Sequence, residues 1–233
     1  MPQNQPNQSS PAPSPSTSLN TSLSIPPNAP PLSVSQIRQI EHKGLAQGLP
    51  LMQRAGRCAA EFALANCNPC RSVWLLVGPG NNGGDALTAG RFLVQAGVSV
   101  TAIMPVSPSA QAVDAQDALA QWHSLGQTTI TDLPDTRTQA APDLIIDGLF
   151  GIGLNKALCE PWQGLIEKVN SQGVPVLTLD IPSGLLADTG QCLGEPITAR
   201  WTLAFIAPSR ALYDEGSQKY IGEAHVCTLG LEI

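Results

Sequence analysis

The chain has 233 residues, with 12 Lys and Arg against 18 Asp and Glu, which gives a formal net charge of −6 at pH 7. This acidic balance argues against nucleic acid as a partner, because nucleic-acid-binding domains carry a basic surface. No stretch approaches the roughly 18 uninterrupted apolar residues of a membrane helix, so we expect no membrane partner. The first charged residue is Arg38. We therefore expect neither a secretory signal nor a transit peptide, and we place the protein in the cytoplasm.

Residues 1–32 have the composition of a disordered tail. They are mainly Pro, Ser, Asn, Gln and Thr, and nine of the 21 prolines lie between Pro2 and Pro31. Such a segment cannot bury enough apolar surface to offset the ordering of its backbone, which costs about 1–2 kcal/mol per residue. We expect residues 1–32 to be disordered and residues 33–233 to form one domain.

Two helices are expected at the start of the folded region. The first follows Ser33 or Ser35, either of which could cap it, and it ends before Gly48. Its apolar positions are Ile37, Ile40 and Leu45. The second helix begins at Leu51 and stops within 66–69. Its apolar positions recur at helical spacing, and they are Leu51, Ala55, Cys58, Ala59 and Phe62.

After Cys70 short β-rich runs alternate with helical stretches, which is typical of βαβ units. The expected strands are 73–77, 98–104, 144–146, 174–179, 202–206 and 225–229. The expected helices between them are 85–96, 109–125 and 162–171. Near-continuous apolar strands flanked by helices predict an α/β fold, a Rossmann-like three-layer α/β/α arrangement with a mostly parallel sheet. Ligands of such sheets bind beyond the carboxyl ends of the strands, so the residues that follow each strand are the candidates for a site.

A glycine-rich turn, residues 78–85, joins the first strand to the next helix. It contains the Gly-x-Gly-x-x-Gly spacing of dinucleotide-binding turns, but a tight strand-to-helix turn explains a bare glycine triplet equally well. The acid that holds a ribose hydroxyl about 20 residues later is missing near Met104, and no Walker A Gly-Lys-Ser/Thr follows. The turn is distinguished by Asn81, Asn82 and Asp85, whose oxygens could ligate a cation or orient a sugar.

Two further strand ends carry an aspartate followed by a loop that contains glycine. Asp147 follows the strand 144–146, and Asp180 follows the strand 174–179 with Ser183 three residues later. An Asp at the end of an apolar strand is costly unless it is paired or solvated, and each one alone could instead be turn chemistry, such as a carboxylate that caps the amides of the next loop. Because the carboxyl ends of parallel strands share one edge of a sheet, three polar strand ends together favour a site there.

Three motifs in this order resemble the YjeF N-terminal domain, the family of NAD(P)HX epimerases. They are 77–85 (Val-Gly-Pro-Gly-Asn-Asn-Gly-Gly-Asp), 147–151 (Asp-Gly-Leu-Phe-Gly) and 180–184 (Asp-Ile-Pro-Ser-Gly). The run 51–56 looks like the family's Leu-Met-Glu-x-Ala-Gly helix, and 207–222 looks like its closing segment. Two residues depart from the pattern, since Gln53 stands where Glu is usual and Ala86 where Gly is common.

The resemblance implies a Rossmann-like fold and an isomerase that interconverts the R and S forms of the hydrated cofactors NADHX and NADPHX. It implies a bound potassium ion (K+), with ligands Asn82, Asp147 and Ser183. These are oxygen donors, which suit a hard cation. It also implies substrate contacts from Asn81, Asn82, Gly83, Gly84, Asp85, Gly151, Ile152, Gly153, Leu154, Asn155, Lys156, Ala157 and Asp180.

Asp180 is the candidate catalytic residue. Loss of the C6 hydroxyl beside the ring nitrogen gives a nitrogen-stabilised cation, and water that returns on the other face inverts the centre. One group must therefore protonate the leaving hydroxyl and then deprotonate water, which an Asp with a raised pKa can do. Potassium and the amides of Gly83 and Gly84 would orient the diphosphate and ribose. Lys156 is a secondary candidate, for which a solvated loop lysine is the plainer explanation.

The main alternative is a non-catalytic ligand-binding or interaction module on the same fold. The intact carboxylates Asp85, Asp147 and Asp180 favour the enzyme, and the missing ribose acid disfavours an ordinary NAD-dependent oxidoreductase. Cys67-x-x-Cys70 has no second pair, so we expect free thiols. Because many family members continue into a dehydratase domain, we expect a functional link to an NAD(P)HX dehydratase in trans, with a dehydratase domain of the same protein outside this sequence as the alternative. We also expect a homodimer.

Overall fold

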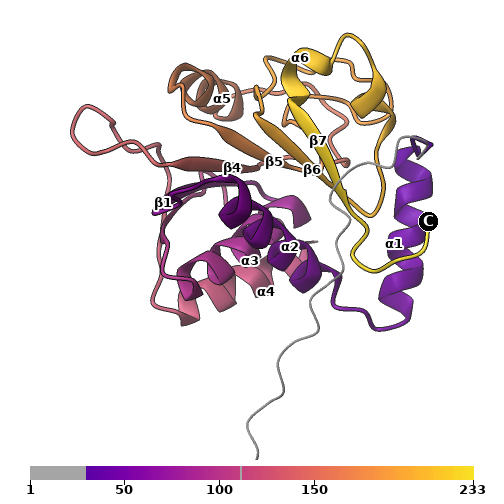
Figure 1. The fold of residues 1–233 in the computed structure, drawn as a ribbon, viewed down its shortest axis with the longest axis horizontal. Coiled ribbons are helices and arrows are strands. Elements are labelled where there is room, and N and C mark those ends of the chain that lie inside the picture. Colours follow the sequence, from indigo (N-terminus) through magenta and orange to yellow (C-terminus); the bar gives the residue numbers. More distant parts are fainter. Residues whose placement is uncertain (1–29, 111) are drawn as a thin grey trace, which may run out of the picture.

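The computed structural model describes residues 30–110 and 112–233, and these alternate between strands and helices around one sheet (Figure 1). The strands are β1 (Ser72–Val77), β2 (Ser99–Ile103), β3 (Thr129–Ile130), β4 (Leu144–Gly148), β5 (Val176–Leu179), β6 (Trp201–Phe205) and β7 (Glu223–Cys227). All pairings between these strands are parallel, in the order β3-β2-β1-β4-β5-β6-β7. The direction in which strands are added therefore reverses at β1 and β4, which is the Rossmann arrangement.

Helices cover both faces of this sheet. Figure 1 shows α2 (Leu51–Asn66), α3 (Asn81–Gln95) and α4 (Val113–Ser124) on one face, and α5 (Trp162–Ser171) and α6 (Gln218–Ile221) on the other. A short 3-10 helix, η1 (Arg210–Tyr213), precedes α6. α1 (Val34–Ala46) stands outside these layers, beside the C-terminus (Figure 1). The expected three-layer α/β/α fold is confirmed.

The start of α1 follows the chemistry of a capping box. The Ser33 hydroxyl accepts a hydrogen bond from the Gln36 amide at 3.3 Å, and the Gln36 side chain accepts one from the Ser33 amide at 2.9 Å. Of the two serines offered by the sequence, Ser33 is therefore the cap. Leu32 forms a β-bridge with Ser209. The rest of the expected disordered tail, residues 1–29, lies outside the described residues.

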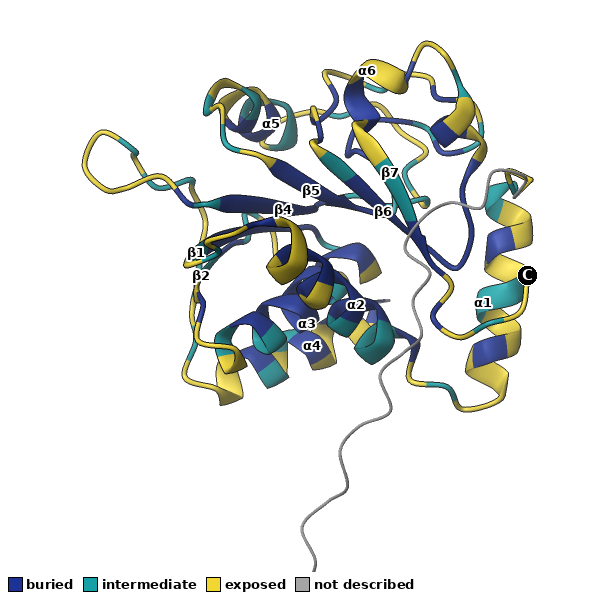
Figure 2. Cartoon of the chain, viewed as in Figure 1, coloured by how far each residue is buried: buried dark blue, intermediate teal, exposed yellow. Residues whose placement is uncertain are grey.

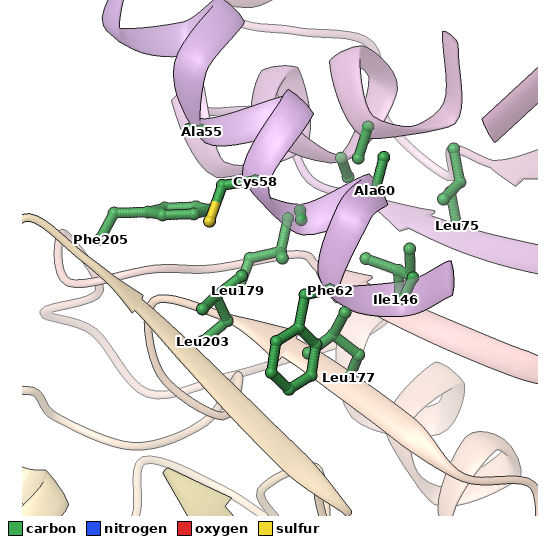
Figure 3. Close-up of a cluster of buried hydrophobic side chains, with 14 of the residues drawn as sticks. Ala55, Cys58, Ala60, Phe62, Leu75, Ile146, Leu177, Leu179, Leu203 and Phe205 are labelled. Carbon is green, nitrogen blue, oxygen red and sulfur yellow. The ribbon is translucent and has the colours of Figure 1, made fainter. Parts of the chain in front are cut away.

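The core fills the space between the sheet and the helices, because the central strands are buried on both faces (Figure 2). Every residue of β4 is buried, including Asp147. In Figure 3, Phe62 of α2 lies against Leu177 of β5 and Leu203 of β6. Asp147 is therefore a polar group within an apolar layer, and it must find partners there.

Most of the expected elements are present with bounds that differ by one to four residues, so that Asp147 lies inside β4 and not after it, while η1 and α6 were not expected. α3 begins at Asn81, although the sequence predicted a start at residue 85. Gly83 and Gly84 have low helix propensity, which hid the first turn of this helix from a pattern-based reading. The two-residue strand β3 was not expected either, because it is too short to show alternation. The six cysteines are free thiols, as expected. No helix among the described residues has the length and hydrophobicity needed to span a membrane.

Candidate active site

A cavity of about 730 Å³ opens at the carboxyl ends of the central strands. Its walls are the start of α3, the loop after β4, the ends of β5 and β6, and one side of α1. Small-molecule and cofactor sites typically have volumes of about 300–1,000 Å³. The cavity adjoins the crossover between β1 and β4, which is where sheets of this kind bind ligands.

The glycines of the 78–85 turn bring two of the sequence motifs into contact. A Cβ atom on Gly78 would lie 1.7 Å from the carbonyl oxygen of Leu149, and one on Gly83 would lie 2.1 Å from the carbonyl oxygen of Gly78. No side chain fits at these distances. The turn after β1 and the loop after β4 therefore depend on glycine for their close packing, which is the tight-turn role that the sequence left open.

The first turn of α3 presents asparagines to the cavity. The amides of Gly83 and Gly84 donate to the carbonyl oxygen of Gly80, at 3.1 and 3.3 Å, and neither glycine lines the cavity. Asn81 and Asn82 both line it, and their amides precede the first helical hydrogen bond. At this turn, the backbone donors left to face a ligand are those of the two asparagines, in place of the two glycines expected from the sequence.

Asp147 is fully buried and fastens β4 to the turn after β5. Its carboxylate accepts hydrogen bonds from the amides of Leu149 (3.1 Å) and Ser183 (3.0 Å). It also accepts from the hydroxyls of Ser183 (2.7 Å) and Thr178 (3.5 Å). Burial raises the pKa of Asp147 to about 6, and these hydrogen bonds act in the opposite direction. The carboxylate therefore has the capping role that was one of its two predicted explanations, and it remains close to the site.

Asn82 carries a buried oxygen that has no hydrogen-bond partner among the described residues. Its side-chain amide donates to the carbonyl oxygen of Leu179 at 3.4 Å, while its Oδ1 accepts no hydrogen bond within the described part of the chain. Leaving a buried acceptor unsatisfied costs about 1–3 kcal/mol, which indicates that a ligand belongs there. Asn82, Asp147 and Ser183 offer amide, carboxylate and hydroxyl oxygens, a donor set that fits a hard cation of low charge. No cluster of three His, Cys, Asp or Glu that could hold a metal occurs among the described residues.

The ends of β5 and β6 are both strained. Asp180 has a φ of 65° and Ile206 a φ of 69°. In each turn the residue that follows this central residue donates a backbone hydrogen bond of 2.8 Å to the residue that precedes it. Together with the positive φ of the central residue, this hydrogen bond defines the rare form of γ-turn. Both central residues line the cavity. Backbone strain of this sort is concentrated at functional sites in proteins.

The surroundings of Asp180 favour its protonated form. Burial raises the pKa of Asp180 to about 6, and the negative charge of Glu41 acts in the same direction. Hydrogen bonds from the amides of Phe205 and Ile152, together with the positive charge of Arg38, oppose this shift. A carboxyl with a pKa near 6 can both give and take a proton close to neutral pH.

A second carboxyl, Asp85 on α3, faces the same space. Burial raises its pKa well above the ordinary value of 3.8, and the negative charges of Asp180, Glu41 and Asp114 raise it further. Carboxyls that share a desolvated space cannot all ionise together. A proton retained on one of these carboxyls is then available for a leaving oxygen.

We expect the stability of the protein in potassium-free buffer to fall as the pH rises from 4 to 7. The pKa of Asp180 is about 6 in the folded chain against an ordinary value of 3.8, so the folded state binds this proton more tightly. The stabilisation that this tighter proton binding supplies is complete below about pH 4 and is lost as the pH passes 6. At 1.36 kcal/mol per pKa unit it amounts to roughly 3 kcal/mol. Urea unfolding of the wild type and Asp180→Asn at several pH values measures it. Parallel curves for the two proteins would contradict the assignment.

The structure brings most of the expected site residues to the cavity wall. Asn81, Asn82, Asp85, Asp180 and the whole loop 151–157 line it. The other four lie behind the wall, and they are Gly83, Gly84, Asp147 and Ser183. The three motifs that follow β1, β4 and β5 therefore meet at one edge of the sheet, as the sequence predicted.

The loop after β4 touches Asp180 directly. A Cβ atom on Gly151 would lie 2.4 Å from Oδ2 of Asp180 and 3.2 Å from Cγ of Asn82. Glycine at this position therefore lets the loop approach both side chains at once. The contact joins the start of the 151–157 loop to the expected catalytic carboxyl.

Sequence reasoning missed the part of the wall that α1 contributes. Arg38 and Glu41 of α1 and Asp114 of α4 line the cavity. The helical period predicted which positions of α1 are apolar, but it carries no signal for where this helix packs. Gln53, which departs from the family pattern, does not line the cavity, and its side-chain nitrogen lies 3.4 Å from the side-chain oxygen of Gln121 on α4.

A doubly wound parallel sheet whose polar strand ends surround one cavity defines an α/β protein of the Rossmann type, with a ligand site at its carboxyl edge. The family described as YjeF-related protein N-terminus matches residues 48–211 of the chain. The chain belongs to this family. It is also 46% identical over 202 residues to the NAD(P)H-hydrate epimerase of Bordetella bronchiseptica, which covers 85% of this chain and 87% of that one.

Other relatives differ in length. The NAD(P)H-hydrate epimerase of Achromobacter xylosoxidans is 45% identical over 203 residues, covering 87% of this chain and 96% of that one. The bifunctional NAD(P)H-hydrate repair enzyme of Leishmania infantum is 39% identical over 188 residues, which are 78% of this chain but 33% of the relative. The crystal structure of yeast ynu0 (YNL200c) superposes with a TM-score of 0.69 at 18% identity, covering 84% of this chain and 87% of that one, and it supports the fold.

Proposed function

We propose that the protein is an NAD(P)H-hydrate epimerase, an isomerase that interconverts the R and S forms of NADHX and NADPHX. The observation that carries the proposal is Asp180, a carboxyl with a pKa near 6 that faces a cavity of about 730 Å³ from a strained turn. The identity of 45–46% to NAD(P)H-hydrate epimerases over most of their length supports it.

The reaction needs proton transfer and no change of oxidation state. Protonated Asp180 gives its proton to the C6 hydroxyl, the carbon–oxygen bond breaks, and water leaves while the ring nitrogen stabilises the cation. Water then adds to the opposite face, and the Asp180 carboxylate accepts the proton that this water loses. The composition of the substrate is unchanged and only the configuration at C6 is inverted. Asp85 faces the same space and keeps a second carboxyl available for the proton.

Substrate positioning falls to the two motifs that frame Asp180. The loop 151–157 lies along one wall and Asn81 lies at the start of α3 on another. The first amides of a helix attract anionic groups, because they have no partner within the helix and lie at the positive end of its dipole. We propose that these groups hold the dinucleotide so that C6 faces Asp180, which contributes orientation to the rate.

We further propose that potassium binds at Asn82, Asp147 and Ser183. The unpartnered Oδ1 of Asn82 and the buried carboxylate of Asp147 support this assignment. When bound, the ion supplies positive charge that offsets the negative charge of the substrate and of the carboxyls around it. Because Asn82 lies in the first turn of α3 and Asp147 near the end of β4, binding of the ion would link these two elements.

Potassium should stabilise the folded protein. We expect a higher melting temperature in potassium chloride than in choline chloride at equal ionic strength, because the ion binds only the folded donor set. In Asn82→Ala the difference should vanish, while Asn81→Ala, which changes the neighbouring cavity-lining residue, should retain it. Scanning calorimetry measures both. A potassium effect that survives in Asn82→Ala would remove this residue from the ligand set.

The epimerase itself is tested by chromatography of the R and S forms. Pure R-NADHX incubated with the protein should approach the equilibrium mixture much faster than the uncatalysed reaction, and potassium should increase the rate. The same preparation should be tested with NADPHX. Absence of interconversion with both substrates, by folded protein in potassium, would refute the proposed function.

We also propose that the protein acts in the cytoplasm as a homodimer and works with an NAD(P)HX dehydratase in trans. The name of the longer Leishmania relative, a bifunctional repair enzyme, supports the functional link. Size-exclusion chromatography with light scattering tests the dimer. Adding the protein to a dehydratase that consumes one epimer should allow both forms to be cleared, which tests the link.

A further inference from the structure

α1 forms one wall of the cavity, and it lies outside the three motifs. The match to the family begins at residue 48, after α1 ends. Nevertheless Ile37, Arg38 and Glu41 all line the cavity. Figure 1 shows why this helix can do so, because it stands apart from the two helical layers, at the side of the sheet. The role of its polar residues is therefore open.

The charges of the cavity are unfavourable for an anionic ligand except at two places. Among the described residues that line it, four are acidic and two, Arg38 and Lys156, are basic. A dinucleotide brings the negative charges of its diphosphate into this space. Phosphate oxygens are bound most strongly by charge-assisted hydrogen bonds, and an arginine presents two parallel donors to them. The position of the basic side chains therefore decides where a phosphate can lie.

Arg38 is already held over the substrate loop. A Cβ atom on Gly153 would lie 3.2 Å from Nη2 of Arg38, so the guanidinium group lies beside the middle of the 151–157 loop. Its Nη1 donates to Oε2 of Glu41 at 2.9 Å. Lys156 forms no ion pair within the described part of the chain. Arg38 is therefore the oriented cation of the cavity, whereas the side chain of Lys156 is exposed.

The pairing of Arg38 with Glu41 leaves the arginine free to take a ligand. The two side chains are 46% and 26% exposed and lie three residues apart on the helix. Such exposed pairs contribute little to stability, typically below about 1 kcal/mol, so Nη1 can exchange partners at small cost. Nη2 is directed to the loop and is not used by the pair. Glu41 thus orients the guanidinium group.

We propose that Arg38 binds a phosphate group of the dinucleotide, and that α1 with the 151–157 loop forms a phosphate clamp at the mouth of the cavity. The inference rests on the proposed function for the identity of the substrate. Arg38 contacts the diphosphate that both substrates share, or the 2′-phosphate that only NADPHX carries. Glu41 is a positioning residue, because it acts through Arg38.

The test compares Arg38→Gln with Lys43→Gln, which removes the same charge from an exposed position of α1 that does not line the cavity. Calorimetric titration with ADP-ribose, which carries the diphosphate, should show about tenfold weaker binding in Arg38→Gln and no change in Lys43→Gln. A tenfold loss corresponds to about 1.4 kcal/mol. KM for NADHX and NADPHX should rise about tenfold together, with kcat little changed. Arg38→Lys should restore part of the binding.

The outcomes separate this inference from the function on which it rests. If KM rises for NADPHX alone and ADP-ribose binding is unaffected, Arg38 binds the 2′-phosphate. If ADP-ribose binding and both KM values are unchanged in a wild-type background that epimerises, the clamp is refuted and the function stands. If the wild type does not epimerise but binds ADP-ribose through Arg38, the function is refuted and the phosphate site stands.

Discussion

Asp180→Asn should reduce epimerisation about a thousandfold. The amide cannot transfer the proton that the C6 hydroxyl and the incoming water require, and loss of a general acid–base group costs about 10²–10⁴-fold in rate. The fold should persist, because Asn is among the few residues that tolerate the positive φ at this position. The measurement is kcat for R-to-S interconversion of NADHX, with ADP-ribose binding determined on the same sample.

Asp117→Asn is the matched control for this variant. Asp117 is an exposed residue of α4 outside the cavity, so its substitution removes the same charge with no expected change in rate. ADP-ribose should bind Asp180→Asn within a few-fold of the wild type. If Asp180→Asn turned over the substrate at close to the wild-type rate, the proton transfer would have to be assigned to the neighbouring carboxyl, Asp85.

Gly151→Ala should reduce turnover about a hundredfold with little effect on global stability. Its new methyl group would lie 2.4 Å from Oδ2 of Asp180 and 3.2 Å from Cγ of Asn82, so both side chains must move. A displacement of about 1 Å at a reacting group can cost two orders of magnitude in rate. Steady-state kinetics and thermal unfolding of the variant separate the two effects.

Gly164→Ala provides the comparison for this second variant. Gly164 lies within α5 and away from the cavity, and its nearest obstacle is the end of the exposed Glu160 side chain, at 2.9 Å. We expect wild-type turnover and a small gain in stability, because Ala is the better helix former. Equal losses of activity in the two alanine variants would mean that the effect of Gly151→Ala is not local to Asp180.

The sequence was sufficient for the sheet and for three of the cavity walls. Apolar runs such as 73–77 are long enough to reveal buried parallel strands, and their polar ends then mark one edge. Asp180, which directly follows β5, and Asp147, the last but one residue of β4, could be placed there because the carboxyl end of a strand has a fixed location in this topology. Asn82 could be placed at the site in the same way, because it lies in the turn that follows β1.

Other features of the site depend on how helices pack in three dimensions, which the spacing of residues in the sequence does not predict. α1 was predicted as a helix, but the placement of Arg38 over Gly153 arises from how α1 docks beside the sheet. The sequence placed the start of α3 four residues late, because the pair Gly83 and Gly84 is typical of a turn, whereas in the structure both glycines are buried in the first turn of the helix. Likewise, the sequence could not show that their amides are occupied by Gly80.

The positive φ angles of Asp180 and Ile206 have a consequence for protein engineering. Glycine adopts such angles without penalty, whereas other residues lose roughly 1–2 kcal/mol there. Laboratory evolution that rewards heat resistance alone would therefore drift toward glycine at position 180, but not at position 206, because the buried side chain of Ile206 contributes more to stability than its strained angle costs. The resulting proteins would melt later and would have lost the acid on which turnover depends, so a screen for hardier variants must also score activity.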